Sequence, residues 1–91
     1  MEIIGKNIRF LRKMTDLTQT ALAKKVGLSR GQISAYEEFR TEPKIQTMVK
    51  IAAFFKITVD TLVKNDLEKV WLPEDIENLM RGNMAKPVNR N

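Results

Sequence analysis

A chain of 91 residues has the length of one small domain, which excludes a two-lobed enzyme with a cleft between its lobes. Its 16 Lys and Arg outnumber its 11 Asp and Glu, and the net charge of +5 favours a polyanionic partner. Histidine and cysteine are both absent, which excludes disulfides and removes the usual general base, thiol nucleophile and zinc ligands. We therefore expect a non-enzymatic domain that uses no cofactor and no metal ion.

The apolar runs of the chain are short. The first ten residues, MEIIGKNIRF, carry an acid at position 2 and have no long apolar h-region of the kind found in signal peptides. The longest apolar run covers residues 51–55, far below the roughly 20 residues needed to cross a bilayer. We expect a cytoplasmic protein without a membrane partner.

The first predicted helix covers residues 3–14. Ile4, Ile8 and Leu11 recur at i, i+4 and i+7, which is the spacing of an amphipathic helix with one buried face. The cations of this segment lie off that face, so the helix is expected to pack on one side and to be solvated on the other.

A second, two-turn helix is predicted over residues 19–26. Thr18 offers a side-chain oxygen as its N-cap, and Gly27 supplies a left-handed stop. We expect three of its residues to face inward: Ala21, Leu22 and Val26.

A third helix is predicted to begin almost at once, because residues 29–32 match the S-x-x-Q capping box. In that motif the Ser29 hydroxyl and the Gln32 side chain each pair with a backbone N–H. Ile33 and Tyr36 are the expected inward residues. The opposite, solvent-facing side carries no acid and consists of Arg30, Gly31, Ser34 and Ala35.

A fourth helix is predicted after residue 42, with Pro43 in its first turn, where a missing N–H has no cost. Its inner stripe is expected to be Ile45, Met48, Ile51, Ala52 and Phe55. Thr58 caps a short fifth helix. No segment shows the sustained alternation of a half-buried strand, so the sequence predicts an all-α domain of five helices over residues 1–65.

Residues 66–91 are predicted to form a C-terminal extension with one short helix after Pro73, Gly82 as its stop, and a frayed tail over 83–91. Two interpretations of its apolar residues stay open. They fold back on the core, or they form a dimer interface. The residues concerned are Trp71, Leu72, Ile76, Leu79 and Met80.

Residues 18–37 form a helix-turn-helix candidate, because two short helices meet at a tight glycine turn. A helix enters the major groove only if its outward face is small and polar and a preceding helix braces it; a small residue such as Ala21 allows that close approach. The run LTQTALAKKVGLSRGQISAYEEFRTEPKIQTMVKIAAFFKITVDTLV resembles the phage-repressor (Cro/C1, XRE-type) helix-turn-helix family. The resemblance covers about two-thirds of the chain and implies a lambda-repressor-like, five-helix DNA-binding domain.

This resemblance assigns residue roles by register. Base edges are implied to meet residues of the third helix: Arg30, Gly31, Ser34 and Ala35. Phosphates are implied to be held by Thr18, Gln19, Arg40 and Lys44. Arg30 is the main candidate, because a guanidinium can donate two hydrogen bonds to O6 and N7 of a guanine. Such a contact contributes about 1–3 kcal/mol of discrimination against other bases. Gln32 has two competing roles, reading adenine or closing the capping box, and capping is favoured.

Three further positions follow from the same alignment. Arg12 is implied to pair with Glu37 and to hold the first helix to the recognition unit. Glu38 and Phe39 depart from the family pattern. Glu38 stands where relatives often carry a polar or basic phosphate ligand, and an acid there repels DNA unless it points away. Phe39 replaces the usual glycine. A left-handed Phe39 is strained, so either the third helix ends differently or the ring is buried.

The sequence thus favours a sequence-specific regulator that binds double-stranded DNA, a repressor acting as a homodimer on a near-palindromic operator and associated with the nucleoid when bound. Residues 1–40 hold 8 Lys and Arg against 4 Asp and Glu, so the positive charge is concentrated in the segment with the helix-turn-helix. The alternative is an antitoxin or adaptor that uses its hydrophobic extension to bind another protein.

Overall fold

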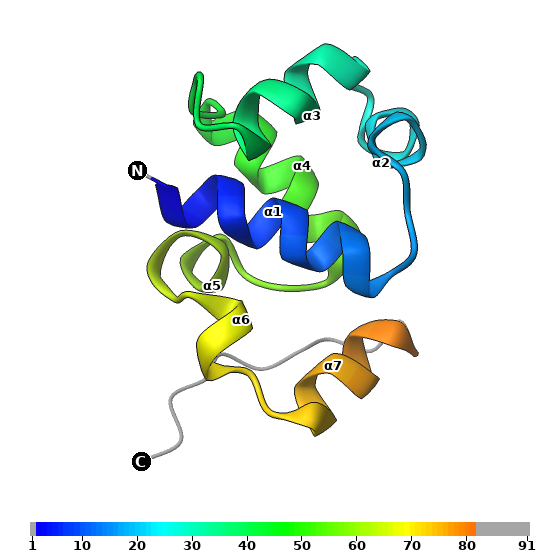
Figure 1. Ribbon diagram of the computed structural model, residues 1–91, viewed down its shortest axis with the longest axis vertical. Helices are drawn as coiled ribbons and strands as arrows, with labels where there is room; N and C mark the ends of the chain where they lie inside the picture. The colour runs from blue at the N-terminus through cyan, green and yellow to red at the C-terminus, as the bar shows by residue number, and fades with distance from the viewer. Residues whose placement is uncertain (1, 82–91) are drawn as a thin grey trace.

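The computed structural model describes residues 2–81, in which seven helices and no strand are found (Figure 1). The helices are α1 Glu2–Met14, α2 Gln19–Val26, α3 Arg30–Glu37, α4 Ile45–Phe55, α5 Val59–Lys64, α6 Leu67–Val70 and α7 Pro73–Met80. The predicted all-α class is confirmed. Over residues 66–81 the extension contains two short helices rather than the one predicted.

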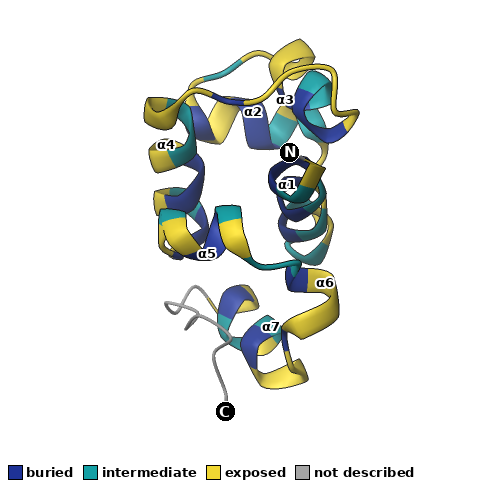
Figure 2. Cartoon of the chain, turned by 90° about the vertical axis from the view of Figure 1, so that its left-hand side faces the viewer, coloured by how far each residue is buried: buried dark blue, intermediate teal, exposed yellow. Residues whose placement is uncertain are grey.

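Helix α1 is the centre of the packing. Its predicted stripe of Ile4, Ile8 and Leu11 is buried, and α1 contacts α3, α5 and α6. Figure 2 shows the buried faces of the helices turned toward one interior, with exposed residues outside. One hydrophobic cluster runs from Ile4 on α1 to Leu79 on α7, so the whole described chain shares a single core.

The ends of α2 form as the sequence predicts. The Thr18 hydroxyl oxygen accepts a hydrogen bond from the Ala21 N–H at 3.0 Å, and Gly27 adopts the left-handed conformation at φ 71°. The inward small residue, however, is Ala23, which is 2% exposed, whereas Ala21 is only half-buried. The prediction chose the wrong alanine because a two-turn helix leaves its inner face poorly defined by spacing alone.

Helix α4 begins later than predicted. Lys44 is its N-cap with an extended backbone, so Pro43 precedes the helix and is buried instead of filling the first turn. Ile45 is 60% exposed, which contradicts its assignment to the inner stripe. Three other members of the stripe are buried as expected: Ile51, Ala52 and Phe55. At 100° per residue Ile45 lies at the margin of the stripe, and as the first helical residue it extends beyond the helices that cover the core.

The extension packs on the core. Leu67, Trp71 and Leu79 are buried, and the Trp71 ring meets the Phe10 ring edge-to-face with centroids 6.1 Å apart. Trp71 and Leu79 are therefore unavailable as dimer contacts, which corrects that part of the sequence prediction. Over residues 66–81, the large apolar residues that are exposed are Val70, Leu72 and Met80. Gly82 and residues 83–91, predicted as a stop and a frayed tail, lie outside the described residues.

Asn7 joins α1 to the segment between α5 and α6. Its side chain is 1% exposed; the amide nitrogen donates to the Leu62 and Asn65 carbonyls at 2.7 and 2.6 Å, and the amide oxygen accepts from the Leu67 N–H at 3.0 Å. A buried amide with three partners fixes where the extension leaves the domain. None of the helices over residues 2–81 has the length and apolar character needed to span a membrane.

Candidate nucleic-acid interface

The start of α3 is fixed by its own side chains. The Ser29 hydroxyl oxygen accepts from the Gln32 N–H at 3.1 Å, and the Gln32 side-chain oxygen accepts from the Ser29 N–H at 2.9 Å. The capping box predicted from sequence is thus complete. Because its carbonyl oxygen is used here, Gln32 cannot make the two-point contact with adenine in this conformation.

The outward face of α3 is polar and carries no acid in its first turn. Arg30 and Gly31 are exposed, Ser34 and Ala35 are half-buried, and Ile33 and Tyr36 point into the core. Arg30 and Ser34 share one row of the helix at i and i+4. The face lies at the α2–α3 end of the molecule, opposite the end occupied by α7 (Figure 1).

A hollow of about 490 Å³ lies between α3 and the start of α4. Gly31, Gln32 and Ala35 line it from α3, and Lys44 lines it from the start of α4. Lys44, the N-cap residue of α4, makes no side-chain capping hydrogen bond to that helix. The structure therefore brings predicted base-reading positions and one predicted phosphate ligand to the same concave surface.

Two other predicted phosphate ligands open α2. Thr18 is exposed, and its oxygen accepts from Ala21 while its hydroxyl proton has no partner among the described residues. Gln19 is half-buried and donates from its amide nitrogen to the Glu37 carboxylate at 3.2 Å. One of the two amide protons of Gln19 is thus directed inward, and the second is left for another acceptor.

The predicted Arg12–Glu37 pair is present and buried. Arg12 donates from Nε and Nη2 to the two carboxylate oxygens of Glu37 at 2.7 and 2.8 Å, and from Nη1 to the Leu17 carbonyl at 2.9 Å. The Glu37 side chain is 3% exposed, and its hydrogen bond raises the pKa of Arg12. This two-point contact holds α1 to the C-terminal end of α3.

Glu38 and Arg40 lie together after α3. The Glu38 carboxylate accepts from the Ser34 hydroxyl at 2.8 Å and from Arg40 Nε at 3.1 Å. The hydrogen bond from Ser34 and the positive charge of Arg40 lower the pKa of Glu38, so the carboxylate is ionised. Arg40, a predicted phosphate ligand, is therefore paired with an acid on the recognition side.

Phe39 has a left-handed backbone, at φ 61°. Its ring is 48% exposed, so the expectation that the ring is buried is wrong. Helix α3 ends at Glu37, and Glu38 is its C-cap. The ring lies against Gly5, where an added Cβ would stand 3.0 Å from it and would overlap the Tyr36 carbonyl. The close approach of α1 to the end of α3 thus requires glycine at position 5.

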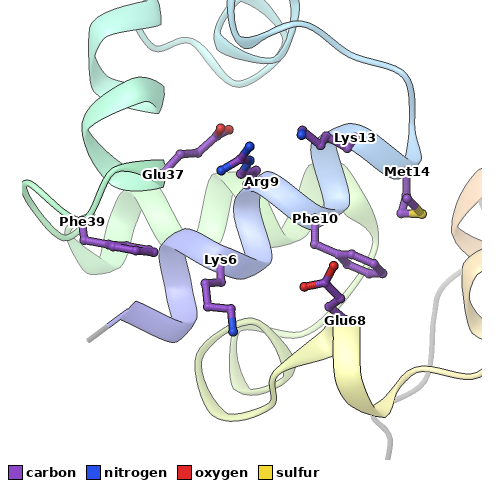
Figure 3. Close-up of a pocket in the computed structure, with 8 residues that line it drawn as sticks. All are labelled: Lys6, Arg9, Phe10, Lys13, Met14, Glu37, Phe39 and Glu68. Atoms are coloured by element: carbon purple, nitrogen blue, oxygen red, sulfur yellow. The ribbon is translucent and has the colours of Figure 1, made fainter.

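A second hollow, of about 380 Å³, lies on the outer side of α1 (Figure 3). Its lining combines cations, acids and apolar side chains from α1, the end of α3 and α6: Lys6, Arg9, Phe10, Lys13, Met14, Glu37, Phe39 and Glu68. Lys6 donates to Asp66 at 2.9 Å, which raises the pKa of Lys6 and lowers that of Asp66. Over residues 2–81 no cluster of three acidic side chains is suited to hold a metal ion.

The helix-turn-helix family matches residues 8–62, which includes the capped α2–α3 pair and the helices that support it. The chain belongs to this family. Cro/C1-type helix-turn-helix proteins are DNA-binding transcriptional regulators, and phage repressors are among them. The predicted family and fold are thus confirmed.

The chain is similar in sequence to several proteins, three of which are described below. The helix-turn-helix transcriptional regulator SinR of Bacillus licheniformis is 32% identical over 97% of this chain, which spans 83% of SinR. The antitoxin PezA of Streptococcus pneumoniae is 34% identical over 98% of this chain, and the immunity repressor of Bacillus phage phi105 is 35% identical over 66% of it. The chain spans only 56% of PezA and 42% of the phage repressor. No solved structure matches this chain.

Sequence reasoning missed two residues of α1 that position the segments packed against this helix. Gly5 permits the contact between α1 and the end of α3, and the signal was a glycine inside a strongly amphipathic helix. Asn7 orders the α5–α6 connection, and the signal was a polar residue beside Ile8 on the buried face. Both depend on segments far away in the sequence, which periodicity cannot identify.

Proposed function

We propose that this chain is a repressor that binds double-stranded DNA sequence-specifically, with α3 in the major groove. The observation that supports this most directly is the exposed first half of α3, which is free of acids, positioned by a complete capping box and braced by α2. A helix presented in this way meets the steric requirement of a recognition helix. The excess of cations within residues 1–40 adds long-range attraction to DNA.

Sequence would be read along two rows of α3. Arg30 donates to O6 and N7 of a guanine, and Ser34 lies one turn further along the same row. Gly31 lets the backbone approach the DNA closely, and Ala35 contacts a thymine methyl group. Gln32 holds the helix start in place and reads no base while the capping box is closed.

Phosphates would be bound on both sides of α3. Thr18 and Gln19 offer a hydroxyl and an amide proton at the start of α2, where the helix dipole favours an anion. Lys44 lies at the start of α4 on the hollow next to α3. The contacts from Thr18, Gln19 and Lys44 fix the register of the protein on DNA without reading bases. Arg40, the fourth residue predicted to bind phosphate, is paired with Glu38 in the free protein.

We propose that two copies bind together on a near-palindromic operator, because one recognition helix reads only a half-site. Residues 66–91 supply the interface, through apolar side chains that the core leaves exposed. In the described part of the extension these are Val70, Leu72 and Met80. A polar rim around such a patch is typical of small homodimers.

The test is a selection of bound sites from random duplex DNA, followed by binding measurements with Arg30→Ala. We expect a near-palindromic site, and a roughly 5- to 150-fold loss of affinity for it in the variant, corresponding to about 1–3 kcal/mol. Affinity should fall steeply with salt. Lys69→Ala, which removes an exposed cation from α6, is the matched control and should keep the preference.

Two results would contradict the proposal. Equal affinity of Arg30→Ala and wild type for the selected site would exclude the base-reading role of Arg30. An absence of any salt-sensitive duplex binding would exclude the DNA-binding function itself.

A second candidate function is supported by the similarity to the antitoxin PezA and by the exposed Leu72 and Met80. In this alternative the extension binds another protein chain and the helix-turn-helix regulates expression of the pair. Co-expression of the chain with proteins from neighbouring genes distinguishes the two candidates. A stable complex that is lost in a Leu72→Ser, Met80→Ser variant supports the second, whereas a homodimer lost in the same variant supports the first.

A further inference from the structure

Three polar side chains form a closed cluster at the C-terminal end of the recognition helix, here called the Glu38 cluster: Ser34, Glu38 and Arg40. The hydroxyl of Ser34 and the guanidinium of Arg40 both donate to the Glu38 carboxylate, and Arg40 Nη2 also reaches the Ser34 oxygen at 3.4 Å. The side chains of Glu38 and Arg40 are 58% and 59% exposed. Water or a ligand can therefore reach both members of the ion pair.

The position of the cluster relative to bound DNA follows from helix geometry. Arg30, Ser34 and Glu38 occur at i, i+4 and i+8, so they lie in one row along the outward face. Eight residues at about 1.5 Å each separate Arg30 from Glu38 by about 12 Å, which is comparable to the width of the major groove. With Arg30 at the base edges, Glu38 and Arg40 lie at the margin of the groove, next to the phosphates.

We propose that Glu38 competes with DNA phosphate for Arg40 and thereby lowers the affinity of this surface for duplex DNA of any sequence. The inference rests on the proposed DNA-binding function and adds a residue that sets the number of phosphate contacts. A phosphate and the Glu38 carboxylate are both oxygen anions that accept from the same guanidinium. Arg40 binds one of them at the expense of the other, and Glu38 also repels the phosphate that approaches.

The cluster also changes what Ser34 offers to DNA. Because the hydroxyl proton of Ser34 is donated to Glu38, the oxygen presents lone pairs to the groove. Glu38 thus affects affinity through Arg40 without itself contacting a base. The expected signature is a uniform change of affinity over all DNA sequences, with the same selected site.

The experiment measures the salt dependence of duplex binding for Glu38→Gln, Arg40→Gln and the double variant. In Glu38→Gln the introduced amide oxygen can still accept from Ser34, so the variant removes the charge and keeps the shape. We expect Glu38→Gln to bind random duplex DNA about 3- to 10-fold more tightly, with a salt slope steeper by up to about 0.9, the value of one phosphate contact. Arg40→Gln should reduce that slope in the Glu38→Gln background and leave it nearly unchanged in the wild-type background.

Glu77→Gln is the matched control. Glu77 on α7 is 56% exposed and pairs with Arg81, the residue that follows this helix, so the variant makes the same charge change at the opposite end of the molecule (Figure 1). An equal gain of affinity in Glu77→Gln would show a net-charge effect and overturn the proposal. Equal slope losses from Arg40→Gln in both backgrounds would overturn it as well.

Three further outcomes are distinct. A different selected base in the Glu38→Gln variant would show that Glu38 sets the sequence preference, directly or through Ser34, which contradicts the proposal. If wild type and Glu38→Gln both lack salt-sensitive duplex binding, the proposed function fails and this inference fails with it. Normal wild-type binding that is unaffected by Glu38→Gln overturns the inference alone.

Discussion

Both ends of the molecule pack on α1, but they are held by different chemistry. The recognition unit, residues 18–38, is joined to α1 by the buried two-point contact between Arg12 and Glu37 and by the close approach at Gly5. The extension, residues 66–81, is joined by the edge-to-face pair of Phe10 and Trp71, together with polar contacts. Apolar side chains of the common core contribute to both attachments. We call the first the polar attachment, because it adds a two-point ion pair, and the second the apolar attachment, because it adds an aromatic pair.

The difference shows which end depends on its surroundings. Helices α2 and α3 have capping side chains of their own, whereas α6 has four residues and no side-chain cap. A helix of four residues has no stability in isolation, so α6 exists because Leu67 and Trp71 are buried against the core. The recognition unit is thus specified locally, whereas α6 is specified by tertiary packing.

The largest expected effect comes from removing the apolar attachment. Trp71→Ala deletes a ring that is 6% exposed, so we expect a loss of about 3–5 kcal/mol in the free energy of unfolding, measured by urea denaturation and circular dichroism. Leu72→Ala, at an exposed neighbouring position, should change stability by less than about 0.5 kcal/mol. Unchanged stability of Trp71→Ala combined with loss of self-association would instead place Trp71 in an interface between copies.

The second-largest loss of stability is expected from removing the polar attachment. Glu37→Ala leaves the Arg12 guanidinium largely buried without its partner, so we expect a loss of about 3 kcal/mol in the free energy of unfolding. The DNA site selected by the folded variant should stay the same, because Arg12 and Glu37 hold the unit and meet no base. A variant with wild-type stability and an altered site would contradict this division of roles.

The smallest effect concerns the ion pair between Lys6 and Asp66. Lys6 holds the pKa of Asp66 below its ordinary value, so the stabilisation is complete at neutral pH and is lost as pH falls through that lowered pKa, below about pH 4. Asp66→Asn should therefore be less stable than wild type at pH 7, with a difference that shrinks toward pH 3. The midpoints of urea denaturation at pH 7 and pH 3 measure this difference in stability. A constant difference would show that the hydrogen bond, and not the charge, is responsible.

The sequence predicted the recognition unit well because its signals are local. The caps at Thr18 and Ser29, the stop at Gly27 and the pair of Arg12 with Glu37 all appear in the structure as predicted. The assigned contacts with bases and phosphates stay predictions. What the alignment could not show is that Arg40 is paired with Glu38 in the folded protein, since that contact depends on the turn at residue 39.

The extension and α4 were predicted less well for a physical reason. Whether Trp71 and Leu79 face the core or the solvent depends on which surfaces the core leaves uncovered, and helical spacing gives only their common face. Ile45 was misplaced because spacing does not show where the covering helices end. Asn7 was missed because all of its partners lie at least 55 residues away.

The capping box at the start of α3 has a consequence for how such a protein changes over time. The helix start is capped by Ser29 and Gln32, and Arg30 and Gly31 between them are exposed, so neither residue has a packing role. Under the proposed function, substitutions at these two positions would alter the recognised DNA without disturbing the fold. A family of repressors can diverge in target, or be reprogrammed by engineering, by exchanging residues within one helical turn.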